Sequence, residues 1–134
     1  MMLIGEGYRY APKIMDNFQQ QKMKPETTID VFQQLDIRVG VILKAEPFPE
    51  ARKPALKLWI DFGNLGILQS SAQITQRYQP AEITGKQVVA IVNFPPRRVA
   101  GFKSECLVLG ASNHQGDVVL IQPDMHVEPG WEIA

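Results

Sequence analysis

The sequence predicts an all-β protein, a small barrel with short flanking helices. Three observations lead to this prediction. The chain has 134 residues, 45% of them hydrophobic and 21% charged, which suits one globular domain with its own core. Apolar and polar residues alternate in several short segments, as they do in half-buried strands. Gly, Pro and Asn residues separate these segments at short intervals, as is typical of small barrels and sandwiches.

The N-terminal part of the chain predicts an arm outside the barrel. Residues 1–28 are polar and weakly patterned, and Met23 opens a segment that could begin the domain in its own right. We therefore expect an N-terminal extension over residues 1–28 and a domain over residues 29–134. Residues 1–22 are expected to lie outside the folded unit.

A short helix and then alternating strands follow this arm. The capping-box pattern from Asp30 to Gln33 predicts a helix that ends near Asp36. Residues 39–46 change to a period of two, and one face is expected to hold four apolar side chains: Val39, Val41, Leu43 and Ala45. Residues 56–62 alternate more strictly and are expected to turn four apolar side chains inward: Leu56, Leu58, Ile60 and Phe62.

The remaining segments complete the barrel. A strand is expected after the Gly–Asn turn that follows residue 62, and a helical turn near residues 75–78. A buried strand over residues 87–92 precedes strands through residues 104–110 and 117–123. About five or six short strands with so little helix fit an OB-fold barrel best.

Two features of these strands predict a homodimer. Trp59 lies on the polar face of its strand, between Lys57 and Asp61, and an exposed tryptophan commonly marks an interface or a stacking surface. Cover by the arm or a loop of its own chain is the alternative. Residues 87–92 are apolar on both faces, so the face outside the barrel needs a lid or a second subunit. We predict that Trp59 lies at the dimer interface.

The chain shows no catalytic or metal-ligand pattern. We therefore expect that the protein is not an enzyme and binds neither a metal nor a cofactor. His114 and His126 lack ligand spacing and are expected at the surface. Cys106 lies in an apolar segment, where it is expected to act as a small core residue. A single cysteine permits no internal disulfide, and no apolar run approaches the roughly 18 residues of a membrane span. With no secretory signal pattern either, we predict a cytoplasmic protein without membrane insertion.

Basic residues concentrate in the middle of the chain. Residues 1–37 carry four bases and five acids, residues 38–103 carry ten and four, and residues 104–134 carry five acids alone. The sums are −1, +6 and −5, which give the net charge of zero. Such asymmetry can steer anionic partners, unless the segments interleave in space and the field averages out.

The corner over residues 93–104 is the strongest candidate for a ligand-binding site. Its two prolines stiffen the backbone, which lowers the entropic cost of ordering long side chains, and Gly101 permits a backbone geometry or close approach that other residues would not. The corner carries three cations and two aromatic rings: Arg97, Arg98, Lys103, Phe94 and Phe102.

The cations of this corner can hold phosphate oxygens, and its rings can contact a base or an apolar peptide side chain. Alternatively, the cations decorate a solvated turn and the rings fill the barrel ends. Arg52 and Lys53 form a second basic group in the loop between the first two strands.

Three stretches closely resemble one family: "FQQLDIRVGVILKAEPFPEARKPALKLWIDFG", "QSSAQITQRY" and "VVAIVNFPPRRVAGFKSECLVLG". These stretches are similar to the CsaA-like proteins of the structure-specific tRNA-binding-domain superfamily, over about residues 30–134. The resemblance implies a homodimeric OB-fold protein without enzymatic activity, an export-related chaperone that binds unfolded precursor proteins and the translocation ATPase SecA. It also maps the superfamily's site pattern onto five residues: Asn93, Arg97, Arg98, Gly101 and Ser104.

Two functions from different classes remain open at this stage. Many relatives that bind tRNA continue after the serine with Gly–Met, whereas Glu105 and Cys106 follow here, and the loop "FPEARKP" replaces their "HPxADxL". These departures favour the chaperone over tRNA binding. A chaperone would present apolar patches, with four candidates: Trp59, Phe48, Phe94 and Phe102. An RNA-binding module would use the same cations on phosphates, with affinity that falls steeply with salt.

Overall fold

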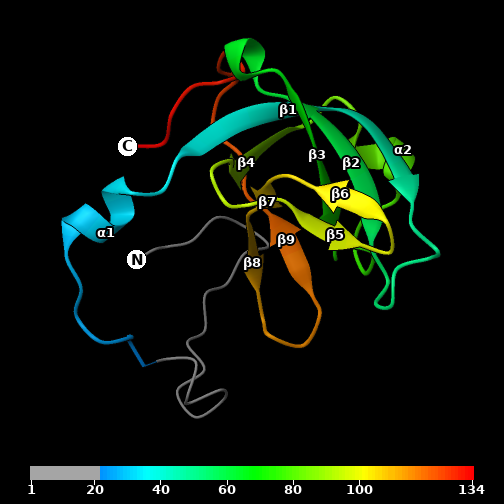
Figure 1. Cartoon of the computed structure of the whole chain (residues 1–134), viewed down its shortest axis with the longest axis horizontal. Helices are drawn as coiled ribbons and strands as arrows, with labels where there is room; N and C mark the ends of the chain where they lie inside the picture. The colour runs from blue at the N-terminus through cyan, green and yellow to red at the C-terminus, as the bar shows by residue number, and fades with distance from the viewer. Residues whose placement is uncertain (1–21) are drawn as a thin grey trace, which may run out of the picture.

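The computed structural model describes residues 22–134. The predicted N-terminal extension falls largely on residues 1–21, outside the described residues, and the boundary at residue 28 stays a prediction. A five-stranded sheet in the order β3-β2-β1-β4-β7 curls into a nearly closed barrel (Figure 1). Its strands are β1 (Ile37–Pro47), β2 (Leu56–Asp61), β3 (Ile67–Ala72), β4 (Gln87–Ile91) and β7 (Leu107–Val108). The predicted small OB-fold barrel is confirmed.

Two hairpins and short helices complete the described part of the chain. The hairpin of β5 (Arg97–Val99) and β6 (Phe102–Ser104) lies in front of the barrel in Figure 1, and that of β8 (Gly110–Ser112) and β9 (Val118–Leu120) projects below it. The helices are α1 (Ile29–Gln33), α2 (Pro80–Ile83) and a 3₁₀ turn over Gly63–Leu65. In residues 22–134 no helix is long and apolar enough to cross a membrane.

The barrel interior is built mainly from β2 and its neighbours. The four side chains of residues 56–62 expected to face inward are at most 4% exposed, so this prediction is confirmed. Ile42, Ile83 and Val88 pack against them from the adjoining elements. Burial of such large aliphatic and aromatic side chains supplies most of the stabilisation, about 1.5–3 kcal/mol for each one fully buried.

The prediction that one face of β1 holds four apolar side chains, Val39, Val41, Leu43 and Ala45, is wrong: Val39 lies in a second cluster outside the barrel and Ala45 packs against the barrel core. Ile42 is fully buried in the barrel, whereas Leu43 is 46% exposed. Gly40 turns toward the interior, where the side chains of Ile60 and Phe62 occupy the space that its missing Cβ leaves. A bulge between Ile42 and Lys44 then shifts the register against β2, and Ala45 packs against the core. Because a bulge changes which face a side chain occupies, a strict period of two could not hold along the whole strand.

The first helix also differs from its prediction. Helix α1 begins at Ile29 and ends at Gln33, and Thr28 at its N-cap makes no side-chain hydrogen bond. Asp30 therefore lies within the first turn instead of forming a capping box with Gln33. A reciprocal box occurs at α2, where Glu82 Oε1 accepts a 2.9 Å hydrogen bond from the backbone N–H of Gln79. The predicted turn near residues 75–78 is confirmed, immediately before this helix.

The outer face of β4 is covered by the chain itself. Val89 and Ile91 form a second apolar cluster with two residues of β1, Ile37 and Val39. The side chains that pack over this cluster come mostly from segments far away in sequence: Leu35, Leu109, Val127 and Ile133. The prediction of a strand apolar on both faces is confirmed, and its lid is the C-terminal segment. This strand therefore does not by itself require a second subunit.

The C-terminal segment is held along β1 by backbone hydrogen bonds. The N–H of Val39 donates to Trp131 O at 2.9 Å, the N–H of Gly130 donates to Val39 O at 2.7 Å, and the N–H of Ile133 donates to Ile37 O at 2.8 Å. In Figure 1 the red C-terminal trace returns past the start of β1. These bonds fix the lid over the second apolar cluster.

Hydrogen bonds close the barrel between β3 and residues 104–106, at the end of β6 and just after it. Ser70 Oγ donates to Cys106 O at 2.8 Å in the interior, and the N–H of Ser71 donates to Ser104 Oγ at 3.0 Å. The N–H of Glu105 donates to Gln69 O at 2.7 Å. Cys106 is buried, and burial raises the pKa of its thiol to about 12, which confirms its prediction as a small core residue.

Candidate ligand-binding site

The Pro–Arg corner folds into a tight β-hairpin. Strands β5 and β6 are joined by the two-residue turn Ala100–Gly101, whose φ angles are 48° and 82°. Positive φ values at both central residues are typical of a type I′ turn. This turn matches the twist of the two flanking strands and favours glycine. A Cβ at Gly101 would meet no atom within 4 Å. Glycine therefore serves the left-handed backbone at this position, and no neighbouring atom packs closely against it.

The hairpin register divides the three cations of the corner. Arg97 is paired with Ser104, and Arg98 is paired with Lys103. Because successive side chains point to opposite faces of a strand, Arg97 shares the inner face with Ser104 and Phe102. Arg98 and Lys103 share the outer face. The corner therefore presents two surfaces, where the linear sequence indicated a single basic group.

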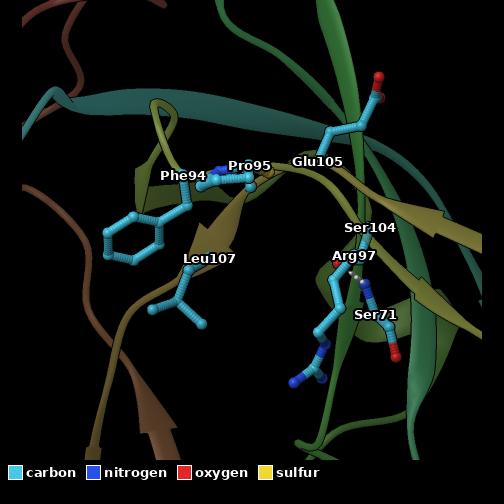
Figure 2. Close-up of a pocket in the computed structure, with 8 residues that line it drawn as sticks. Ser71, Phe94, Pro95, Arg97, Ser104, Glu105 and Leu107 are labelled. Carbon is cyan, nitrogen blue, oxygen red and sulfur yellow. Dashed lines mark hydrogen bonds between the residues drawn. The ribbon is translucent and has the colours of Figure 1, made fainter.

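A pocket of about 260 Å³ opens on the inner side of the hairpin (Figure 2). Eight residues line it: Ser71, Phe94, Pro95, Arg97, Ser104, Glu105, Cys106 and Leu107. Phe94 and Leu107 are 43% and 48% exposed, so much of the apolar wall faces water. Arg97 places a guanidinium beside this wall.

Arg97 differs from the other two cations in having no partner. Among residues 22–134 it makes neither an ion pair nor a hydrogen bond through its side chain. Arg98 Nη1 donates to Gly101 O at 3.1 Å, and Lys103 Nζ lies 4.0 Å from Glu105 Oε2. Of the three cations, the one inside the pocket is thus the one without an intramolecular partner among the described residues.

Two predicted site residues serve as anchors. Asn93 Oδ1 accepts a 2.9 Å hydrogen bond from the backbone N–H of Asp36, and Asn93 Nδ2 donates to Gln34 O at 2.9 Å. This side chain ties the end of β4 to the start of β1 and thereby positions the corner. Ser104 has a similar role toward β3 through Ser71 N–H, while its hydroxyl still lines the pocket.

The aromatic candidates do not form one exposed patch. Phe48 is only 3% exposed, and its ring lies 5.4 Å from that of Phe102. Phe102 also meets Trp59 edge-on at 5.8 Å, and Trp59 Nε1 donates to Gln69 Oε1 at 3.1 Å. Hence Trp59 is half-buried and partly covered by its own chain, the alternative left open by the sequence. Of the four predicted apolar contacts, Phe94 reaches the pocket.

The second basic group lies beside the hairpin without joining the pocket. Arg52 and Lys53 are exposed on the loop between β1 and β2. Phe48, in the same loop, touches Phe102 of the hairpin. Lys53 borders a different hollow, which it shares with polar residues of the β8–β9 turn such as His114. The predicted exposure of His114 and His126 is confirmed.

Sequence reasoning missed Ser71 and Leu107. Ser71 comes from β3, more than 30 residues before Ser104 in the chain, and the two meet only because the barrel closes there. Leu107 pairs with Ile91 at the edge of β4. No local pattern in the sequence marks either residue, since both reach the pocket through strand pairing.

Comparison with known proteins shows the family to which the chain belongs. Residues 37–132 match the model of the putative tRNA binding domain, and the chain belongs to this family. Methionine–tRNA ligase of Bacteroides fragilis is 37% identical over 117 residues, which are 87% of this chain and 17% of the ligase. The chain thus spans less than a fifth of the length of such ligases.

Two solved structures place the chain more narrowly within the family. Chaperone CsaA from Bacillus anthracis is 55% identical with a TM-score of 0.79, and the match covers 82% of this chain and 100% of that one. CsaA chaperone protein from Picrophilus torridus is 48% identical with a TM-score of 0.76, covering 81% and 100%. The chain is a CsaA-like member of the tRNA-binding-domain family.

Proposed function

We propose that the protein is a non-catalytic chaperone that binds unfolded precursor proteins for export through its OB-fold surface. The observation that carries this proposal is the half-apolar pocket beside the β5–β6 hairpin, where Phe94 and Leu107 face water next to the unpaired Arg97. Exposed apolar side chains at the edge of a pocket mark a surface that gains free energy when an apolar partner covers it. Unfolded polypeptides supply such apolar side chains.

Relatives support a binding role over a catalytic one. The two CsaA structures are named as chaperones and are covered completely by the match. The methionine–tRNA ligases share only the segment that corresponds to this domain. In an export role the protein would act in the cytoplasm and would hand its clients to the translocation ATPase SecA, as the resemblance implies.

A second candidate is a structure-specific tRNA- or RNA-binding module. The family is described as a putative tRNA binding domain, and Arg98 and Lys103 form an exposed cationic pair on the outer face of the hairpin. Arginine and lysine on such a face can contact phosphates without reading the bases. Peptide binding and RNA binding would then use opposite faces of one hairpin.

A competition experiment tests the two functions. A fluorescent, chemically unfolded precursor polypeptide is bound to the purified protein and chased with total tRNA at low and moderate salt. We expect tRNA bound on the outer face of the hairpin to block access to the neighbouring pocket and displace the polypeptide only at low salt, because screened phosphate contacts weaken steeply as salt rises. Phe94→Ala should weaken polypeptide binding about tenfold, the effect of about 1.4 kcal/mol of lost apolar contact. Arg98→Ala should instead flatten the salt dependence of tRNA binding.

The matched comparison for Phe94→Ala is Leu65→Ala, which truncates an exposed apolar residue of a different hollow, beside Pro129 and Trp131, and should leave binding unchanged. Retention of tRNA at moderate salt, together with no binding of the polypeptide, would overturn the chaperone function in favour of the RNA-binding module.

We also propose that the protein is a homodimer. Exposed apolar residues remain in and just after β9, where Val119 and Ile121 are each 43% exposed. Static light scattering at micromolar concentration is expected to give twice the 15.1 kDa mass of the chain. If Trp59→Ala forms a dimer of unchanged stability, Trp59 does not lie at the interface. A stable monomer of the wild-type protein would refute the dimer itself.

A further inference from the structure

The pocket beside the hairpin combines hydrogen-bond donors on one side. Arg97 has a guanidinium that lines the cavity and has no ion pair or hydrogen bond within residues 22–134. Ser104 Oγ accepts a hydrogen bond from the N–H of Ser71, so its own hydroxyl hydrogen remains to donate. Figure 2 shows these groups on one side of the pocket, with the Arg97 side chain extending past Ser104 and Ser71. A guanidinium with a neighbouring hydroxyl is a binding arrangement for an oxyanion.

The acidic residue of the pocket does not neutralise this arrangement. Glu105 Oε1 accepts a 3.0 Å hydrogen bond from the N–H of Gln69, and its Oε2 lies 4.0 Å from Lys103 Nζ. In Figure 2 the Glu105 carboxylate points away from the end of the Arg97 side chain. The Glu105 carboxylate thus interacts with Gln69 of β3 and with Lys103 on the outer face of the hairpin, and it does not pair with the Arg97 guanidinium.

The other side of the pocket is apolar. Phe94, Pro95 and Leu107 form it, and Figure 2 shows the Phe94 ring and the Leu107 side chain on the left of the view, one above the other. Together these three residues offer contacts to an aliphatic or aromatic side chain rather than a single flat stacking surface. The volume of about 260 Å³ is below the roughly 300–1,000 Å³ of pockets for drug-sized ligands, so it suits a residue or two of an extended chain.

We propose that this pocket selects, within an unfolded polypeptide, an apolar side chain that lies next to a carboxylate. The apolar side chain covers Phe94 and Leu107, and the carboxylate binds the Arg97 guanidinium and the Ser104 hydroxyl. This inference rests on the proposed chaperone function and specifies the segment of the client that is bound. The carboxylate has two sources in a polypeptide: the chain terminus, and an aspartate or glutamate side chain.

Fluorescence anisotropy with labelled short peptides tests the proposal on the full-length protein. One pair ends in an apolar residue with either a free carboxylate or a C-terminal amide. A second pair is amidated and places either an aspartate or an asparagine beside an internal leucine. We expect the carboxylate member of at least one pair to bind about tenfold more tightly, as for one charge-assisted hydrogen-bond pair. The pair that shows the difference identifies the source of the carboxylate.

Two arginine variants test whether the preference for carboxylate peptides arises in the pocket or on the outer face of the hairpin. Arg97→Gln should abolish the difference between carboxylate and amide peptides, whereas Arg98→Gln removes the same charge from the outer face and should change it less than about twofold. Equal effects of the two variants, or equal affinity for both members of each pair, would overturn the proposal. Binding of the unfolded precursor is measured in parallel. If it persists without carboxylate selectivity, only this inference fails, and if tRNA alone binds, the chaperone function fails as well.

Discussion

Gly40→Val is expected to lower the free energy of unfolding by about 3 kcal/mol or more, because it overfills the centre of the barrel. A Cβ at Gly40 would lie 2.5 Å from Ile60 Cγ2 and 2.7 Å from Phe62 Cε1. Both neighbours are fully buried, so neither can move into solvent. Close-packed interiors transmit such strain to the backbone. Urea unfolding followed by circular dichroism measures the loss.

Two further variants separate overpacking from a general effect of replacing glycine. Gly101→Ala introduces a Cβ into open space at a φ of +82°, and should cost only the backbone strain of about 1–2 kcal/mol. Gly40→Ala combined with Phe62→Leu should recover part of the loss of Gly40→Ala alone, because leucine lacks the ring edge that meets the new methyl group. If Gly40→Val proved no more costly than Gly101→Ala, the packing argument would be wrong.

Gly130→Ala is expected to cost about 2–3 kcal/mol of stability and to loosen the C-terminal lid. Its φ is +97°, and a Cβ there would lie 2.6 Å from Phe62 O. Gly63 faces the same turn, with a φ of +67° and a built Cβ only 2.4 Å from Pro129 O. Backbone therefore touches backbone where the turn after β2 meets the turn before Trp131. No side chain fits between them.

Loosening of the lid should expose the second apolar cluster on β1 and β4. Limited proteolysis with mass spectrometry is expected to show earlier cleavage near the C-terminus of Gly130→Ala, together with increased binding of a hydrophobic dye. Gly85→Ala is the matched control, since Gly85 has a φ of +91° with no atom within 4 Å of its built Cβ. An equal stability loss and unchanged proteolysis in both variants would show that backbone strain alone is responsible.

The ion pair between Arg77 and Asp117 is a long-range tertiary contact that the sequence did not indicate. The Arg77 guanidinium donates to this carboxylate through two nitrogens, and this hydrogen bonding lowers the pKa of Asp117. The pair joins the turn before α2 to the β8–β9 hairpin, 40 residues apart in the chain. Neither residue belongs to a pattern that predicted the contact.

Local patterns in the sequence were sufficient for the class of fold and for much of the core. Strict alternation over residues 56–62 identified the inward side chains of β2, and an unbroken apolar run identified β4 as buried on both faces. Cys106 was placed in the core by its apolar neighbours. These features depend on the period of two and on burial, which a chain encodes residue by residue.

Tertiary structure alone decided the features that depend on register and on contacts between distant segments. The bulge after Ile42 in β1 left Leu43 exposed and brought Ala45 to the same inner face as Ile42, and the C-terminal segment became the lid of β4. Hairpin pairing turned Arg97 into the pocket and Arg98 away from it. Barrel closure brought in Ser71. A shift of one residue in pairing reverses which face a side chain occupies. The sequence therefore determined the barrel and its basic corner, while the folded chain determined which arginine lines the pocket.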